Sequence, residues 1–185
     1  ISKSSRPVVL IGGGVKIAEA SNELHEIGEL LKIPMYPTWN ALDVVTSDYK
    51  YYCGRVGTYG GAGRNFGIQN SDLLISIGSR VSGRVTGGNT KTFARAAKKY
   101  MVDVDEGVLK KEFQQVPFDE TINCDAKKFL KIFKEYLVKN KFKTDKKKDD
   151  WLKQCIQWKI TYDPVKKSFF KNTNTVQPYA FIRTL

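Results

Sequence analysis

The sequence predicts an α/β protein whose parallel β-sheet is covered by helices on both faces. Short apolar runs without polar alternation recur along the chain, which is typical of strands buried on both faces. Segments with helical spacing or long crossovers separate these runs, as parallel strands require. Three consecutive glycines follow the first run, in "PVVLIGGGV". Together these observations favour a doubly wound, Rossmann-like sheet of about six strands.

The predicted strands and helices alternate in order. We expect strands within residues 7–11, 33–36, 72–78, 99–105 and 116–124. A helix after the glycines is predicted from apolar residues at helical spacing, namely Ile17, Ala20, Leu24, Ile27 and Leu31. A later helix over residues 125–137 is expected to turn inward the side chains of Phe129, Ile132, Phe133 and Tyr136.

The composition changes near residue 140, where we place a domain boundary. Residues 1–140 form the predicted sheet domain, and residues 141–185 are expected to be a connecting helix and linker. One face of that helix should carry Trp151, Leu152, Cys155, Trp158 and Tyr162, with Pro164 after its end.

Both ends of the chain are interpreted as internal to a longer protein. The chain starts at Ile1 without an initiator methionine. Near its end, Pro178 suits a first helical position, and Phe181, Ile182 and Leu185 would then form an apolar face. We therefore expect further domains before and after these residues.

The net charge of +12 is concentrated late in the chain. Residues 127–171 contain 15 lysines, no arginine and 5 acidic residues, whereas residues 1–126 contain 15 basic and 14 acidic residues. Because arginine, the commonest reader of bases, is absent from the basic segment, we interpret it as a solvated helix face or linker. We expect no nucleic-acid partner, and a basic nucleic-acid-binding module is a remote alternative.

The cysteines and the hydropathy of the chain limit the possible cell compartment and the possible partners. Cys53, Cys124 and Cys155 lie far apart in no metal-binding spacing, so we interpret them as small buried residues of a reducing, cytoplasmic protein. No apolar run approaches the roughly 20 residues of a membrane span, so we expect no membrane partner. Without a nucleophile motif or a paired acid and base, we predict no catalytic residue and no metal site.

Glycines and polar residues follow the predicted strands. Because the carboxyl ends of parallel strands meet at one edge, these residues should share a rim where ligands bind. Glycine amides there can approach a phosphate, arginines can add charge-assisted hydrogen bonds, and carboxylates can accept from ribose hydroxyls. The rim predicts a nucleotide-shaped ligand and contains Gly12, Gly13, Gly14, Thr38, Trp39, Asn40, Gly78, Ser79, Arg80, Arg84, Asp103, Asp105, Cys124 and Asp125.

Structural interpretations compete with this hypothesis at single residues. The glycines also suit a tight turn, Arg80 and Arg84 suit surface ion pairs, and Asp103 and Asp125 suit helix caps.

Aromatic residues and the glycine spacing are also open to simple explanations. We interpret Trp39 and Tyr59 as packing residues, and the single histidine, His25, as structural. Ile17 occupies the third glycine position of a dinucleotide fingerprint, and no acid follows the second strand. Ordinary NAD binding is therefore disfavoured.

Five stretches resemble, in order and spacing, the central domain of thiamine diphosphate (ThDP) enzymes, most closely that of acetolactate synthase. They are "RPVVLIGGGV", "IPMYPTWNALDVV", "GRVGTYGGAGRNFGIQNSDLLISIGSRVSGRVTG", "KYMVDVDE" and "INCDAKKFL". The resemblance covers about residues 4–137, and the stretch from Gly54 to Gly87 is its most specific part.

The resemblance implies a domain between two ThDP-binding domains, holding FAD or, as in other relatives of the fold, ADP. The implied contacts are those of the rim without Ser79, together with Gly57, Thr58 and Tyr59. ThDP and Mg²⁺ would belong to N- and C-terminal domains outside these residues, so the chain alone is expected to be inactive. The whole enzyme, a homodimer or tetramer, would decarboxylate a 2-oxo acid such as pyruvate and transfer the two-carbon unit.

Several positions depart from the usual acetolactate synthase pattern. Thr58 and Tyr59 stand where the synthases often have methionine and histidine, and Ser82 and Gly83 stand where the synthases have an acid between the two arginines. Trp39 is bulkier than the usual leucine, and Cys124 replaces a glycine. A second hypothesis therefore stays open. The chain would then be the central domain of another ThDP-dependent decarboxylase or lyase, with an ADP-binding or vestigial nucleotide site.

Overall fold

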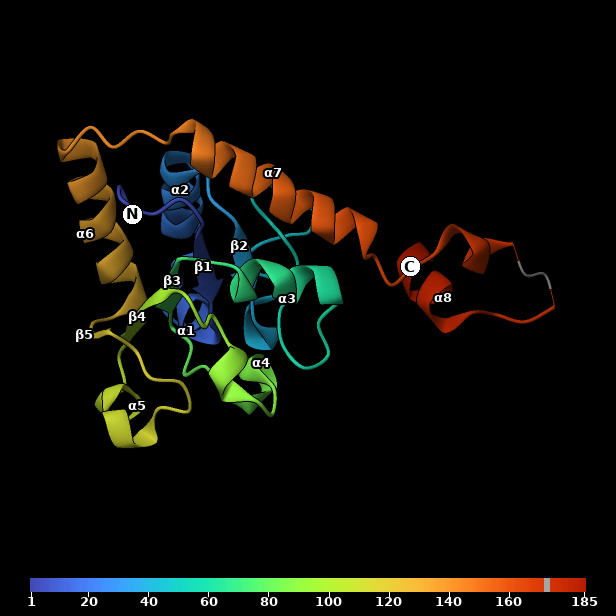
Figure 1. The fold of residues 1–185 in the computed structure, drawn as a ribbon, viewed down its shortest axis with the longest axis horizontal. Helices are drawn as coiled ribbons and strands as arrows, with labels where there is room; N and C mark the ends of the chain where they lie inside the picture. The colour runs from blue at the N-terminus through green and yellow to red at the C-terminus, as the bar shows by residue number, and fades with distance from the viewer. Residues whose placement is uncertain (172–173) are drawn as a thin grey trace.

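The computed structural model describes residues 1–171 and 174–185, which contain one parallel sheet (Figure 1). Its strands are β1 (Pro7–Ile11), β2 (Met35–Pro37), β3 (Leu73–Ile77), β4 (Lys98–Asp103) and β5 (Glu120–Asn123). The spatial order is β2-β1-β3-β4-β5, so the chain winds outward from β1 in both directions. The predicted α/β class is confirmed, with five strands in the described residues.

The helices cover both faces of the sheet. They are α1 (Gly13–Ile17), α2 (Ser21–Leu31), α3 (Ala62–Gln69), α4 (Gly83–Thr86), α5 (Glu106–Leu109), α6 (Ala126–Lys139), α7 (Lys146–Thr161) and α8 (Pro178–Thr184). Short 3₁₀ turns are η1 (Trp39–Ala41), η2 (Thr90–Thr92), η3 (Lys111–Phe113) and η4 (Lys167–Phe170).

Side chains of the central strands point alternately to the two faces of the sheet and pack into two separate hydrophobic clusters. Val9 of β1, which lies opposite Met35 of β2 and Ile75 of β3, packs into the cluster that α2 and α6 cover. Val8 and Leu10 point to the other face, into the cluster that α3 and α7 cover. This two-sided burial explains why the strands read as continuous apolar runs.

The helix predicted after the glycines is two helices. Glu19 adopts a positive φ of 50°, which ends α1, and α2 begins at Ser21. Leu24, Ile27 and Leu31 are buried as predicted. Ile17 is 86% exposed, so its place on the buried face was predicted wrongly, because the break reorients α1.

Helix α6 buries a different face from the predicted one. Leu130 and Leu137 are buried, whereas Ile132 and Tyr136 are 53% and 64% exposed. Phe129 and Phe133 are half-buried, in agreement with an inward position.

Ion pairs between α6 and α2 help to set the rotation of α6. Lys134 approaches Glu26 at 2.9 Å, and Lys127 and Lys131 approach Glu23 at 3.8 and 3.9 Å. Part of the excess positive charge therefore lies on the surface of α6, as the interpretation of the basic segment as a solvated helix face predicts.

Helix α7 packs on the sheet domain although it lies beyond the predicted boundary. Trp151 and Cys155 are buried, and the Trp151 Nε1 donates to the carbonyl of Pro7 at 3.1 Å. Leu152 and Trp158 are half-buried, and Tyr162, 48% exposed, contacts the ring of Phe66. The boundary near residue 140 stays a prediction, and α7 is part of the second hydrophobic cluster.

The C-terminal segment lies apart from the sheet. Figure 1 shows η4 and α8 beyond the end of α7, on the side away from β5. Phe181, Ile182 and Leu185 of this segment are exposed. Among the described residues, no helix has both the length and the apolar character that crossing a bilayer demands.

A close backbone contact joins the carboxyl ends of β1 and β3. A Cβ atom on Gly12 would lie 2.0 Å from the Gly78 carbonyl oxygen, and one on Gly14 would lie 2.7 Å from the Gly78 Cα. Gly78 itself has a positive φ of 62°, which favours glycine. Three of the glycines are therefore needed for packing at this contact.

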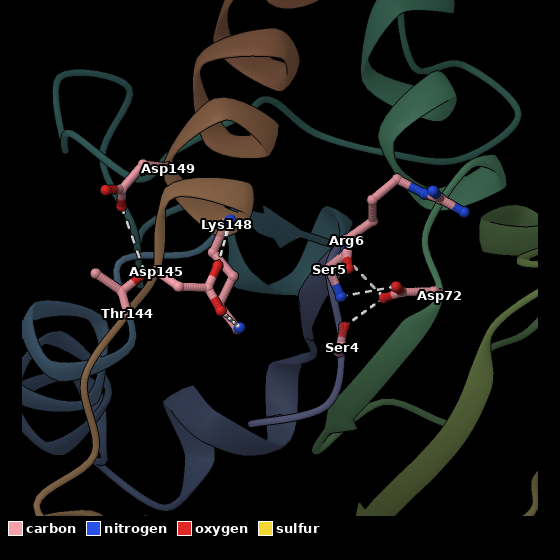
Figure 2. A network of polar contacts seen from close by, with 8 residues as sticks. All are labelled: Ser4, Ser5, Arg6, Asp72, Thr144, Asp145, Lys148 and Asp149. Carbon is pink, nitrogen blue, oxygen red and sulfur yellow. Dashed lines mark hydrogen bonds and ion pairs between the residues drawn. The ribbon is translucent and has the colours of Figure 1, made fainter.

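At the opposite edge of the sheet, Asp72 ties the N-terminal segment to β3 (Figure 2). Its carboxylate accepts hydrogen bonds from the Ser4 hydroxyl and from the backbone amides of Ser5 and Arg6, the latter two at 2.8 and 2.9 Å. Burial raises the pKa of the Asp72 carboxyl, but these hydrogen bonds outweigh it and lower the pKa below its ordinary value.

Figure 2 also shows the first turn of α7, where Asp145 caps the helix. Its carboxylate accepts from the Lys148 backbone amide at 3.1 Å and forms an ion pair with the Lys148 ammonium. The Lys148 side chain is 1% exposed, so this pair compensates a buried charge.

Replacing Gly12 with alanine should destabilise the protein by about 1–3 kcal/mol, because the new methyl group would overlap a backbone carbonyl that cannot rotate away. Urea unfolding measures the effect. Gly88→Ala is the matched control, since a Cβ there has nothing within 4 Å. Equal unfolding midpoints for the two variants would contradict the tight contact.

Replacing Asp72 with asparagine should cost about 1–3 kcal/mol of stability at neutral pH. A carboxyl whose pKa is lower in the folded state stabilises the fold above the unfolded pKa, about 3.9, and loses this effect as the pH falls through the folded value. The wild type and the variant should therefore converge below about pH 4. Urea unfolding from pH 7 to pH 2 tests this, with exposed Glu112→Gln as control; a constant gap would refute the charge-dependent role.

Candidate functional site

A cavity of about 890 Å³ lies at the carboxyl edge of the sheet. Residues after all five strands line it: Gly13 and Gly14 follow β1, Thr38, Trp39 and Asn40 follow β2, Gly78, Arg80 and Arg84 follow β3, Asp103 and Asp105 close β4, and Cys124 and Asp125 follow β5. Its volume is in the range of small-molecule sites, roughly 300–1,000 Å³. Its position at the strand ends agrees with the predicted rim.

Four predicted residues do not line the cavity: Gly12, Gly57, Thr58 and Tyr59. Gly12 is buried in the contact with Gly78. The Thr58 amide donates to the Arg84 carbonyl at 2.9 Å, so Gly57 and Thr58 brace α4 from outside the cavity. Tyr59 is 72% exposed, so its interpretation as a packing residue is wrong.

The structure adds wall residues that the strand-end reasoning missed. Ser82 lies beside the two arginines, and an apolar wall is formed by Ile17, Ala18, Val85, Val102, Val104, Val108 and Ala126. Ile17 and Val104 are 86% and 70% exposed. Their apolar character gave no signal in the sequence, because the same residues suit a buried helix or strand face equally well.

The backbone amides of Gly12 and Gly14 donate hydrogen bonds within the protein. The Gly12 amide donates to the Ile77 carbonyl and the Gly14 amide to the Gly78 carbonyl, both at 2.9 Å. These two donors are therefore not free to bind a phosphate. Helix α1, with five residues, is also too short for a strong terminal dipole.

Arg80 and Arg84 supply the positive charge at the cavity. Both side chains are exposed, and within residues 1–171 and 174–185 neither forms an ion pair with a carboxylate. The loop that carries both arginines is anchored by Val81, whose side chain is buried in the core at 1% exposure and whose φ is positive, at 49°. Three carboxylates, Asp103, Asp105 and Asp125, line the same cavity, but none forms an ion pair with these arginines in the described residues, so both guanidinium groups are suited to bind an anion such as a diphosphate.

The carboxylates of the rim are partly engaged in capping. Asp125 accepts from the Lys128 amide at 3.0 Å and caps α6, as one interpretation predicted. Asp105, instead of Asp103, caps α5 through the Gly107 amide at 2.8 Å. Asp103 accepts from the Asp105 amide at 3.1 Å, which leaves its second oxygen available to a ligand hydroxyl.

Trp39 lines the cavity with 44% of its surface exposed, and its ring packs against the Arg55 guanidinium, so the packing interpretation holds for part of the ring only. His25, by contrast, has the structural position expected: its ring stacks on Tyr49 with a centroid distance of 4.7 Å.

Cysteines and metal-binding groups are distributed as follows. Cys53 and Cys155 are buried, and burial raises the pKa of the Cys53 thiol. Cys124 is half-buried at the cavity, unlike the buried position expected. In the part of the chain that the structure describes, no three His, Cys, Asp or Glu side chains gather as a metal site would require.

Known proteins resemble the chain along most of its length. Residues 1–133 match the family described as the central domain of thiamine pyrophosphate enzymes. A probable acetolactate synthase large subunit of Methanococcus aeolicus is 36% identical over 171 residues, which is 91% of this chain and 27% of that protein. The one of Methanocaldococcus jannaschii is 33% identical over all 185 residues, or 30% of its length. The large subunit of acetolactate synthase isozyme 2 of Escherichia coli K12 is 38% identical over 111 residues, 60% of this chain and 20% of that protein.

The chain thus spans less than a third of the length of these relatives. The match to the family covers both the sheet and the cavity at its carboxyl edge. This chain belongs to the family of thiamine pyrophosphate enzyme central domains.

Proposed function

We propose that this chain is the nucleotide-holding central domain of a longer, acetolactate synthase-like ThDP-dependent enzyme. The observation that carries the proposal is the cavity at the strand ends, where Arg80 and Arg84 form no ion pair with any described residue. The named relatives support the enzyme type, since they are acetolactate synthase large subunits. The whole protein would decarboxylate a 2-oxo acid such as pyruvate and transfer the two-carbon unit to an acceptor.

FAD or ADP fits the residues of the cavity. Arg80 and Arg84 would hold the diphosphate, and Asp103 would accept a hydrogen bond from a ribose hydroxyl. The apolar wall of Ile17, Ala18, Val85, Val104 and Val108 would remove a flat ring from water. In this proposal a bound FAD contributes binding energy and supplies no redox step to the overall reaction.

The catalytic cofactors would lie elsewhere in the longer protein. ThDP and Mg²⁺ would be held by flanking N- and C-terminal domains, and the assembled enzyme would be a cytoplasmic homodimer or tetramer. This assignment is supported by the family match and by the share of the relatives that the chain spans. It makes the present chain a holder of a cofactor without catalytic residues.

Replacing Arg80 with alanine should weaken FAD and ADP binding by roughly 10- to 100-fold, because a charge-assisted hydrogen bond contributes about 1.5–3 kcal/mol. Isothermal titration of the purified protein measures the change. Arg95→Ala, which removes an exposed arginine outside this cavity, serves as the charge-matched control. Unchanged affinity in Arg80→Ala would refute the diphosphate contact, and a wild-type protein that binds neither ligand would refute the nucleotide site.

Thermal unfolding separates the two classes of cofactor. A saturating nucleotide should raise the Tm of this chain, because a ligand that binds only the folded state stabilises it by mass action. ThDP with Mg²⁺ should leave the Tm unchanged, and the chain should not consume pyruvate. A Tm rise of several degrees with ThDP and Mg²⁺ alone would place their site within this chain and contradict the proposal.

A further inference from the structure

Trp39 and Arg55 form a stacked pair at the wall of the cavity. The Arg55 guanidinium carbon lies 3.8 Å from the centroid of the Trp39 ring, within the range of a cation–π contact. Trp39 follows β2 and begins η1, whereas Arg55 comes from the loop before Gly57. Arg55 does not itself line the cavity, and the strand-end reasoning did not select it.

The stack determines which side of the indole is free. Arg55 covers one face of the ring, yet Trp39 is 44% exposed and lines the cavity. The surface left open to the cavity therefore belongs to the other face and the edges of the ring. The Thr38 amide donates to the Ile11 carbonyl at 2.8 Å and anchors the backbone beside Trp39 to the end of β1.

The guanidinium has few other contacts that would explain its position. Its Nη2 donates to the Tyr59 carbonyl at 3.4 Å, a long hydrogen bond. Its Nε is buried without a hydrogen-bond partner among the described residues. The Trp39 ring is thus a main partner of Arg55, and the contact favours the orientation of the indole that the structure shows.

We propose that the free face of Trp39 is a stacking platform for a flat heteroaromatic ring of the nucleotide, and that Arg55 is the positioning residue behind it. This inference rests on the proposed function and specifies how the same site recognises its ligand. The ring would be the adenine or the isoalloxazine, both linked to a diphosphate. Base–aromatic stacking is strong enough to contribute substantially to affinity.

The placement of the charges agrees with this arrangement. Trp39 follows β2 and Arg80 follows β3, with β1 between them. Two strand spacings correspond to about 10 Å, which is the scale of one nucleoside between a ring and its diphosphate. Helix α1, which carries the apolar wall residues Ile17 and Ala18, contacts η1 directly, so the apolar wall continues from the platform.

Three probes separate stacking from diphosphate binding: FAD, ADP and inorganic pyrophosphate, which has no ring. If the adenine is the ring that stacks, Trp39→Leu should weaken the binding of both FAD and ADP roughly tenfold or more. If the isoalloxazine stacks, the same variant should weaken the binding of FAD alone. It should bind pyrophosphate as the wild type does. Trp39→Phe, which keeps an aromatic face, should recover most of the affinity. Tyr136→Leu, an equivalent change at an exposed aromatic residue of α6, is the control.

Arg55 is tested through its dependence on Trp39. Arg55→Met should weaken nucleotide binding about two- to fivefold without affecting pyrophosphate, and Arg55→Lys should restore part of it. In a double-mutant cycle, Arg55→Met should have no further effect when Trp39 is already leucine. A merely structural role would instead weaken pyrophosphate binding too, and would add to the Trp39→Leu effect.

Two results would overturn the inference while leaving the proposed function in place. One is a Trp39→Leu variant that binds FAD and ADP as tightly as the wild type, while Arg80→Ala loses both. The other is an Arg55→Met effect that persists undiminished in the Trp39→Leu background. Absence of all nucleotide binding by the wild type would instead refute the proposed function, and the stacking platform with it.

Discussion

The contact between the backbone of Gly12–Gly14 and Gly78 is the constraint on which the carboxyl edge of the sheet depends. β1 and β3 are adjacent in the sheet, and the chain leaves them toward opposite faces. At this topological switch point the two exits must pass each other, and a Cβ on Gly12 would already overlap the Gly78 carbonyl. Only backbone without side chains allows the exits to lie so close.

The positions of the charged side chains follow from this contact. After Gly78 turns with a positive φ, Val81 turns back into the core, also with a positive φ, and α4 begins two residues later. Arg80 and Arg84 are therefore left on the outer side of the loop. The Thr58 amide holds the Arg84 carbonyl from the far side, so the loop is fixed by hydrogen bonds within the chain itself. A site built in this way has little ordering entropy to lose on binding.

Much of this arrangement could be predicted from the sequence, and the remainder could not for definite physical reasons. The buried strands are readable because continuous β-branched runs have few alternatives, and their ends identify a common rim. The rotation of α6 is less readable, because Phe129, Leu130, Phe133 and Leu137 all suit an inward face. Lysine pairs with α2, formed only in the folded protein, distinguish Leu130 from Ile132. The break between α1 and α2 at Glu19 could not be predicted, because no glycine or proline lies at that position in the sequence.

The role of the three consecutive glycines could not be decided from the sequence. A glycine required by a neighbouring backbone and a glycine required by a ligand look identical in a sequence, since both are defined by the lack of a side chain. Here the Gly12 and Gly14 amides donate to carbonyl groups of the protein, so their hydrogen bonds are already satisfied. Any affinity for an anion then depends on side chains that the contact positions, chiefly the arginines of the following loop. Ligand preference can change through single side chains such as Trp39 while the glycines, and the fold, stay the same.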